Sequence, residues 1–205
     1  MDFDELGSRL QGLNLYLVGM MGTGKSAVGR PLAAALGYRF VDADAALEQV
    51  AARPIPEIFA SEGETGFRAL ETAVLGQIAT WHSLVVATGG GVVTQPPNWG
   101  HMRQGVVVWL DAPEELLLQR LNADPTPRPL LEAPNPAARL AELLEQRRSL
   151  YAQADLHITQ GGESPEQVAS LVLAGLPAIL KTEPAAPTGP VSLLNAEGRP
   201  TQSLN

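Results

Sequence analysis

The sequence has no cysteine among its 205 residues, which excludes disulfide bonds and thiolate metal sites. It also lacks long apolar runs: the longest, at 171–180, is about half of the ~20 residues that a membrane-spanning helix needs. Residues 1–5 are acidic, whereas a signal peptide begins with basic residues. We therefore expect a cytoplasmic protein that has no membrane partner.

Positive charge is scarce as well. The formal net charge is −8, and only Lys25 and Lys181 among the 14 basic residues are lysines. A nucleic-acid backbone requires clustered lysine and arginine, so the composition argues against a nucleic-acid partner. Lys25 lies inside a glycine-rich loop, which indicates a role other than solubility.

The length of the chain suits one α/β domain with a sizeable core. Short runs rich in valine, leucine and isoleucine predict strands at 13–18, 38–41, 84–87, 105–110 and 156–159. The segments between them predict helices at 25–36, 43–52, 64–80, 113–122, 136–151 and 164–176. Near-continuous apolar strands joined by helical crossovers favour a five-stranded parallel sheet with helices on both faces.

Two segments are rich in proline. Residues 123–135 hold prolines at 125, 127, 129 and 134 around Arg128, and we expect a loop there that acts as a mobile lid. Residues 182–205 hold four further prolines and predict a flexible tail after a single domain at 1–181.

Residues 19–26 read Gly-Met-Met-Gly-Thr-Gly-Lys-Ser and match G-x-x-x-x-G-K-[ST], the P-loop. Its glycines let backbone N–H groups curl around a phosphate, and the following helix directs its positive end at the same anion. Lys25 adds charge toward the β- and γ-phosphates, and the Ser26 hydroxyl can ligate Mg²⁺. The residues expected to bind ATP here are Gly22, Thr23, Gly24, Lys25, Ser26 and Ala27.

Two other interpretations of this loop stay open. Residues 22–27 also fit G-x-G-x-x-A, a dinucleotide-binding pattern, with Asp42 about 20 residues further on. The complete octet is more specific, and Gly19 begins the turn earlier than a dinucleotide loop requires. A glycine turn that binds nothing would leave Lys25 unexplained.

A P-loop alone does not identify the phosphate acceptor. The Asn-Lys-x-Asp signature of GTPases is absent, and the size favours a small-molecule kinase. Gluconate and nucleoside monophosphates are alternative acceptors for such a kinase. Outside enzymes, the alternative is a regulator that binds ATP without using it.

Polar and glycine residues follow two of the predicted strands, at the edge where ligands bind in open α/β sheets. Asp42 and Asp44 follow the second strand. One carboxylate can help to hold Mg²⁺ while the other contacts a substrate hydroxyl, or one of them only caps the next helix. Gly89, Gly90 and Gly91 follow the third strand, where a ligand can approach the backbone directly, or they form a plain turn.

Six motifs occur in one order between residues 19 and 151: G-x-x-G-x-G-K-S, F-V-D-A-D, E-I-F-A-S-E-G-E-T-G-F-R-A-L-E, G-G-G, R-P-L-L and R-x-S-L-Y. This ordered set resembles the shikimate kinase family. The resemblance implies a P-loop kinase fold with a mobile lid, and ATP- and Mg²⁺-dependent phosphorylation of the 3-hydroxyl of shikimate on the route to chorismate and aromatic amino acids.

The resemblance also implies roles on the acceptor side. Asp44 matches the aspartate that binds the hydroxyl to be phosphorylated, and it is the candidate general base. Asp42 matches the aspartate that helps to hold Mg²⁺ through water. The residues that match the shikimate-binding positions are Asp44, Arg68, Gly90, Gly91 and Arg147.

On the donor side, Arg128 matches the lid arginine that reaches the transferred phosphate, and Arg120 falls near the position that stacks on adenine. With Lys25 and Asp44, Arg128 completes the expected catalytic set. The family resemblance further suggests a monomer. The chain departs from the family at 52–55, where Ala52 replaces a common glycine, and at 147–151, where Ser149 replaces a common proline. Both departures concern local backbone geometry and leave the charged contacts in place.

Overall fold

The computed structural model describes residues 3–124, 128–131 and 133–180. Five parallel strands form one sheet with the order β2-β3-β1-β4-β5. This confirms the expected α/β fold, and the strands lie at or close to the predicted residues. They are β1 (Leu15–Val18), β2 (Arg39–Asp42), β3 (Leu84–Ala87), β4 (Val106–Asp111) and β5 (Leu156–Thr159).

The strand order separates two of the interpretations of the glycine-rich loop. β1 lies between β3 and β4, whereas the dinucleotide-binding fold places its second strand beside its first. The loop after β1 therefore does not belong to a dinucleotide-binding sheet, and the P-loop interpretation remains.

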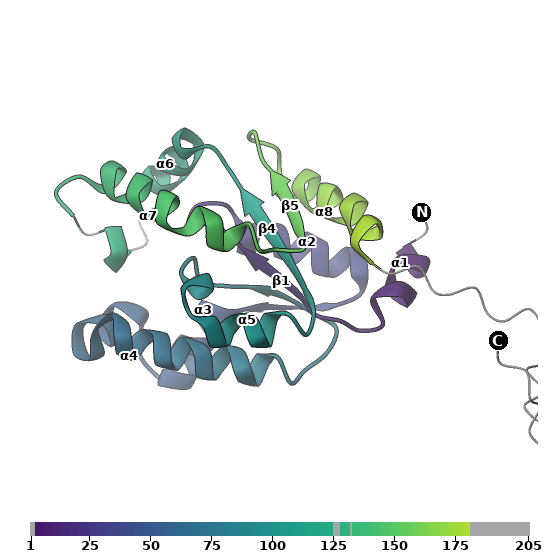
Figure 1. Ribbon diagram of the computed structural model, residues 1–205, viewed down its shortest axis with the longest axis horizontal. Coiled ribbons are helices and arrows are strands. Elements are labelled where there is room, and N and C mark those ends of the chain that lie inside the picture. The colour runs from purple at the N-terminus through teal and green to yellow at the C-terminus, as the bar shows by residue number, and fades with distance from the viewer. Residues whose placement is uncertain (1–2, 125–127, 132, 181–205) are drawn as a thin grey trace, which may run out of the picture.

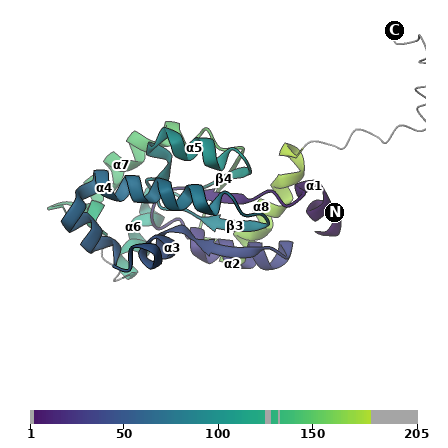
Figure 2. The ribbon, with the colours of Figure 1, turned by 90° about the horizontal axis from the view of Figure 1, so that it is seen from below.

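Helices cover both faces of the sheet (Figure 2). One core lies between the sheet and α1, α2 and α8, and the other lies between the sheet and α4, α5 and α7. Neighbouring residues of β1 alternate between these cores, which explains why its sequence is apolar throughout. The helices are α1 (Phe3–Leu10), α2 (Lys25–Leu36), α3 (Ala43–Ala51), α4 (Ile55–Ile78), α5 (Pro96–Met102), α6 (Glu114–Ala123), α7 (Pro136–Tyr151) and α8 (Pro165–Ile179).

Three helical regions differ from the sequence prediction. α1 and α5 were not expected, and α4 begins at Ile55 although its pattern predicted a start at residue 64. Gly63 explains the second difference, because its φ of 67° and ψ of −175° place a kink inside α4. The pattern therefore identified only the part of α4 that follows the kink.

The structure describes the predicted lid only in part and the predicted tail not at all. Between α6 and α7 lies the short 3₁₀ helix η2 (Pro129–Leu131), while 125–127 and 132 lie outside the described residues. The tail predicted at 182–205 also lies outside them. Over the ranges that are described, no helix is long and apolar enough to cross a membrane.

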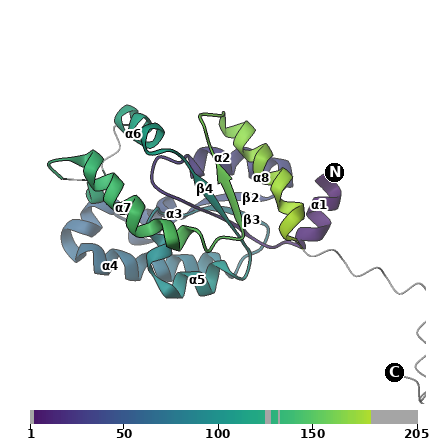
Figure 3. The ribbon, with the colours of Figure 1, turned by 45° about the horizontal axis from the view of Figure 1, so that its top comes forward.

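Because all five strands are parallel, their carboxyl ends meet at one edge of the sheet. α4, α6 and α7 extend past that edge (Figures 1 and 3). A cleft of about 800 Å³ opens there, lined by the loop after β1, by the ends of β2 and β3, and by α4 and α6. This is the edge at which open α/β sheets bind their ligands.

Candidate active site

The loop after β1 has a backbone that glycine makes possible. Gly19, Gly22 and Gly24 have φ values of 143°, 83° and 82°, in the region that other residues avoid. At Gly19 a Cβ would also lie 2.2 Å from the carbonyl oxygen of Leu110 in β4. α2 begins immediately afterwards at Lys25, so its N-terminal amides face the cleft side of the loop.

Lys25 is 9% exposed, and its side chain curls back over the loop. Nζ donates hydrogen bonds to the carbonyl oxygens of Gly19, at 2.8 Å, and Met20, at 3.0 Å. Burial lowers the pKa of Lys25 to about 8, although Asp44 and Asp42 oppose the shift. The ammonium group is therefore still charged near neutral pH, and it lies on the wall of the cleft.

Asp42 joins the loop to the start of α3. Its Oδ2 accepts a hydrogen bond of 2.5 Å from the Ser26 hydroxyl, and its Oδ1 accepts from the backbone N–H groups of Asp44 and Ala45. Asp42 is thus the N-cap of α3, as one interpretation of the sequence expected, and it also contacts Ser26. A hydroxyl and a carboxylate are oxygen ligands of the kind that Mg²⁺ prefers, and Mg²⁺ usually takes only one or two carboxylates from the protein. The pair fits such an ion, and the described part of the chain holds no cluster of three or more His, Asp or Glu that would suit a metal bound by protein alone.

Asp44 lies two residues past the cap and lines the cleft. Burial raises the pKa of Asp44 to about 6, and the nearby carboxylates of Asp42 and Glu71 add to the shift. A carboxylate with a pKa in this range can accept a proton from a hydroxyl group near neutral pH.

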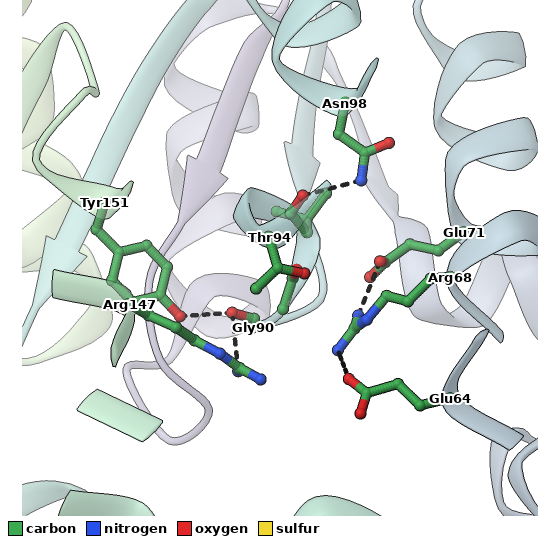
Figure 4. Close-up of polar contacts among 10 residues, drawn as sticks. Glu64, Arg68, Glu71, Gly90, Thr94, Asn98, Arg147 and Tyr151 are labelled. Atoms are coloured by element: carbon green, nitrogen blue, oxygen red, sulfur yellow. Dashed lines mark hydrogen bonds and ion pairs between the residues drawn. The ribbon is translucent and has the colours of Figure 1, made fainter. Parts of the chain in front are cut away.

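Arg68, on α4, is 6% exposed and is held by two carboxylates (Figure 4). Nη1 donates to Glu71 at 2.8 Å, and Nη2 donates to Glu64 at 3.1 Å. Gly91 lies against the same guanidinium, since a Cβ there would be 2.1 Å from Nη2. The side chain of Arg68 is therefore fixed in the wall of the cleft, with its direction set by the two carboxylates.

Arg147, on α7, approaches from the opposite side (Figure 4). It is 4% exposed, and Nη1 donates to the carbonyl oxygen of Gly90 at 3.3 Å. The hydroxyl of Tyr151 donates to the same oxygen at 2.5 Å. The guanidinium groups of Arg68 and Arg147 thus flank the glycine loop after β3, and a planar anion between them would receive hydrogen bonds from both.

Arg120 and Arg128 lie on the α6 side of the cleft. Nη1 of Arg120 donates to the carbonyl oxygen of Gly22 and to the side chain of Gln160, both at 3.2 Å. Arg128 pairs with Asp124 at 2.6 Å. Arg120 therefore contacts the P-loop itself, while Arg128 lies within the predicted lid segment, 123–135.

The structure brings most of the predicted site residues to one cleft. Thr23 and Arg147 are exceptions, since neither is among the residues that line it: Thr23 is buried, and Arg147 is 4% exposed and donates to the carbonyl oxygen of Gly90 beside the cleft. The predicted residues that line the cleft are Gly22, Gly24, Lys25, Ser26, Ala27, Asp42, Asp44, Arg68, Gly90, Gly91, Arg120 and Arg128.

Three contributors were missed from the sequence: Glu71, Tyr151 and Gln160. Glu71 is three residues after Arg68, and Tyr151 is four after Arg147, which are the spacings that place side chains on one face of a helix. That spacing could have revealed both residues. Gln160 meets the P-loop only through the fold, and no local pattern indicates it.

Comparisons with known proteins agree with this geometry. The sequence model of the shikimate kinase family matches residues 21–177. A shikimate kinase from Synechococcus sp. (strain RCC307) is 60% identical over 182 residues, which cover 89% of this chain and 93% of the relative. The solved shikimate kinase from Acinetobacter baumannii in complex with shikimate aligns with a TM-score of 0.77 and 43% identity, over 81% of this chain and 93% of that one. The solved shikimate kinase from Aquifex aeolicus aligns with a TM-score of 0.71 and 35% identity, over 81% and 97%. The cleft described above is therefore that of a kinase, and the chain belongs to the shikimate kinase family.

Proposed function

We propose that this enzyme transfers the γ-phosphoryl group of ATP to the 3-hydroxyl of shikimate, giving shikimate 3-phosphate and ADP. The observation that carries the proposal is the pair of buried arginines, Arg147 against Gly90 and Arg68 against Gly91, beside a cleft that the P-loop also lines. Two fixed guanidinium groups suit a small acceptor that carries one carboxylate. Nucleoside monophosphates carry no carboxylate and fit this arrangement less well. Gluconate does carry one, and the match to the shikimate kinase family favours shikimate over it.

On the acceptor side, Arg68 and Arg147 bind the carboxylate and set the orientation of the ring. Gly90 and Gly91 have no side chain, so the substrate can approach their backbone directly. At Gly91 a side chain would also collide with Arg68. Asp44 then accepts the proton of the attacking hydroxyl. The hydroxyl oxygen forms the new bond to the γ-phosphorus, the bond from that phosphorus to the bridging oxygen breaks, and ADP leaves.

On the donor side, the backbone amides of 22–27 surround the phosphates, and Lys25 places its charge beside the β- and γ-phosphates. For that purpose its ammonium group exchanges the carbonyls of Gly19 and Met20 for phosphate oxygens. Ser26 and Asp42 would hold Mg²⁺, and the bound ion would neutralise charge that develops on the phosphate oxygens. Arg128 adds positive charge at the transferred group from the lid side, which is expected to close over both substrates.

The test is ADP release with Mg²⁺ and ATP across a panel of shikimate, quinate, gluconate and nucleoside monophosphates. Saturable turnover on shikimate alone is expected. Turnover on another acceptor of the panel, with none on shikimate, would support a P-loop kinase but contradict shikimate as its acceptor. ATP binding without turnover on any acceptor would favour a regulator.

We also propose a monomer working in the cytoplasm, with the family domain at 1–181 and the proline-rich tail at 182–205 dispensable for catalysis. Light scattering on the purified full chain tests whether the protein is a monomer. Deleting 182–205 tests whether the tail is dispensable, and unchanged kinetics with shikimate are expected.

A further inference from the structure

Gln160 connects three parts of the nucleotide side of the cleft. It directly follows β5, is 2% exposed, and its backbone N–H donates to the carbonyl oxygen of Asp111 at 2.8 Å. Its Nε2 donates to the carbonyl oxygen of Thr23 at 2.9 Å, and its Oε1 accepts from Nη1 of Arg120 at 3.2 Å. The orientation of the amide is unambiguous, because a carbonyl only accepts hydrogen bonds and a guanidinium only donates them.

The contact with Thr23 controls the direction of one peptide group in the P-loop. The peptide bond between Thr23 and Gly24 is trans, so the N–H of Gly24 points away from the carbonyl that Gln160 holds. Thr23 is buried, whereas Gly24 lines the cleft. The bond to Gln160 therefore turns the N–H of Gly24 toward the side on which a phosphate binds.

This peptide group needs such a restraint. Gly24 forms one side of it and Gly22 precedes Thr23, with φ values of 82° and 83°, and glycine can adopt other backbone angles at little steric cost. The same Nη1 of Arg120 that meets Gln160 also donates to the carbonyl oxygen of Gly22, at 3.2 Å. Gln160 and Arg120 together therefore satisfy the carbonyl oxygens of two consecutive P-loop residues.

We propose that Gln160 is a positioning residue for the nucleotide: it fixes the Thr23–Gly24 peptide group and holds Arg120 against the P-loop, so that ATP and ADP meet a loop already in its binding shape. The inference rests on the proposed function of the P-loop. Loss of the Gln160 hydrogen bonds is therefore expected to weaken the binding of ATP and ADP and to leave the binding of shikimate unchanged.

The experiment compares Gln160→Met and Gln160→Glu with the full-length wild-type enzyme. Gln160→Met keeps the size of the side chain and removes both hydrogen bonds. Gln160→Glu keeps an acceptor for Arg120, removes the donor to Thr23, and sets a carboxylate against its carbonyl oxygen. The matched control is Asn14→Leu, because Asn14 is also a buried amide that bridges two backbone groups, Trp81 O at 2.7 Å and Leu84 N at 3.0 Å, but at the opposite end of β1.

The measurements are KM for MgATP and for shikimate, the Kd of MgADP by calorimetry, and the melting temperature. In both Gln160 variants we expect the KM for MgATP and the Kd of MgADP to rise about tenfold or more, with the KM for shikimate within about twofold of wild type. Asn14→Leu should lower the melting temperature and leave all three constants unchanged.

Nucleotide constants within about twofold of wild type in both Gln160 variants would overturn the inference, as would an equal rise in Asn14→Leu. Failure of the wild-type enzyme to phosphorylate shikimate would instead refute the proposed function. The MgADP comparison would still decide the role of Gln160 in that case.

Discussion

The carboxyl groups of Asp44 and Glu71 converge on one backbone position, since a Cβ on Gly89 would lie 2.8 Å from Oδ1 of Asp44 and 2.8 Å from Oε1 of Glu71. Glu71 is buried, and its Oε1 has no hydrogen-bond partner among the described residues. Burial raises the pKa of both carboxyl groups, that of Asp44 to about 6. This crowding costs stability, and it also prepares Asp44 to take a proton.

Asp44→Asn should therefore separate catalysis from binding. The amide cannot accept the hydroxyl proton, so kcat should fall by about 10²–10⁴ while the KM for MgATP changes by less than about twofold. Coupled measurement of ADP release gives both constants. A kcat close to wild type would remove Asp44 from the role of general base.

The same variant should be more stable than wild type at pH 7 in Mg²⁺-free buffer. The folded-state pKa of Asp44, about 6, lies above its ordinary value of 3.8, so ionised Asp44 disfavours the folded state. The penalty is complete above pH 6 and vanishes below the ordinary value, where the carboxyl is protonated in both states. Asp44→Asn should raise the melting temperature by about 2–4 °C at pH 7, and this difference should shrink as the pH falls from 6 toward 4. An equal difference in melting temperature between variant and wild type at pH 7 and pH 4 would contradict this explanation.

Arg147→Lys tests the carboxylate contact. A guanidinium can hold a carboxylate with two hydrogen bonds, whereas an ammonium acts as a point charge, so the KM for shikimate should rise about tenfold or more with the KM for MgATP unchanged. The matched control is Arg148→Lys, because Arg148 is the exposed neighbour on α7 and should tolerate the change. A change in the KM for MgATP alone would show that Arg147 contributes to nucleotide binding and not to shikimate binding.

Glu64 and Glu71 hold the same guanidinium but should have opposite effects. Glu64 is 53% exposed and competes with the substrate carboxylate for Arg68, so Glu64→Gln should lower the KM for shikimate by up to about threefold. Glu71 is buried and keeps Arg68 in place, so Glu71→Gln should raise that KM about tenfold or more. Steady-state kinetics with shikimate as the varied substrate distinguish the two. A higher KM in Glu64→Gln would show that Glu64 supports Arg68 and does not compete for it.

Ala52→Gly should stabilise the fold without affecting catalysis. Ala52 ends α3 with a φ of 52°, a left-handed conformation that favours glycine. We expect a gain of about 0.5–1 kcal/mol in the free energy of unfolding, measured by urea denaturation. Ala51→Gly, one residue earlier and inside the helix, should instead lose a similar amount. Stabilisation by both substitutions, or by neither, would contradict the left-handed conformation of Ala52 at the end of α3.

Much of this fold could be predicted from the sequence because its signals are local. Each strand of a buried parallel sheet is a short apolar run, and the P-loop carries glycines wherever its backbone takes positive φ values. Lys25 and Ser26 follow directly from that motif, and the family resemblance supplied Arg68 and Arg147.

The remaining features depend on packing between distant segments. α1 is too short to be stable alone, and it folds because Leu6 and Leu10 are buried against α2 and α8. The partner of Arg120 could not be predicted either, because Gln160 is forty residues further on and reaches it only after β5 pairs with β4. The kink at Gly63 has a similar cause, since glycine permits the break but does not require it.

The position of β2 and β3 side by side at one edge of the sheet has an evolutionary consequence. The block between them, residues 43–83, leaves and re-enters the sheet on adjacent strands and carries Asp44 and Arg68. The path from β1 to β4 and β5, where the nucleotide side is built, lies outside this block, so a replacement block has to match the rest of the chain mainly where α3 and α4 pack into the core below the sheet. A lineage, or a protein engineer, could therefore obtain a new acceptor specificity by replacing one contiguous block and adjusting Arg147 on α7 to match it.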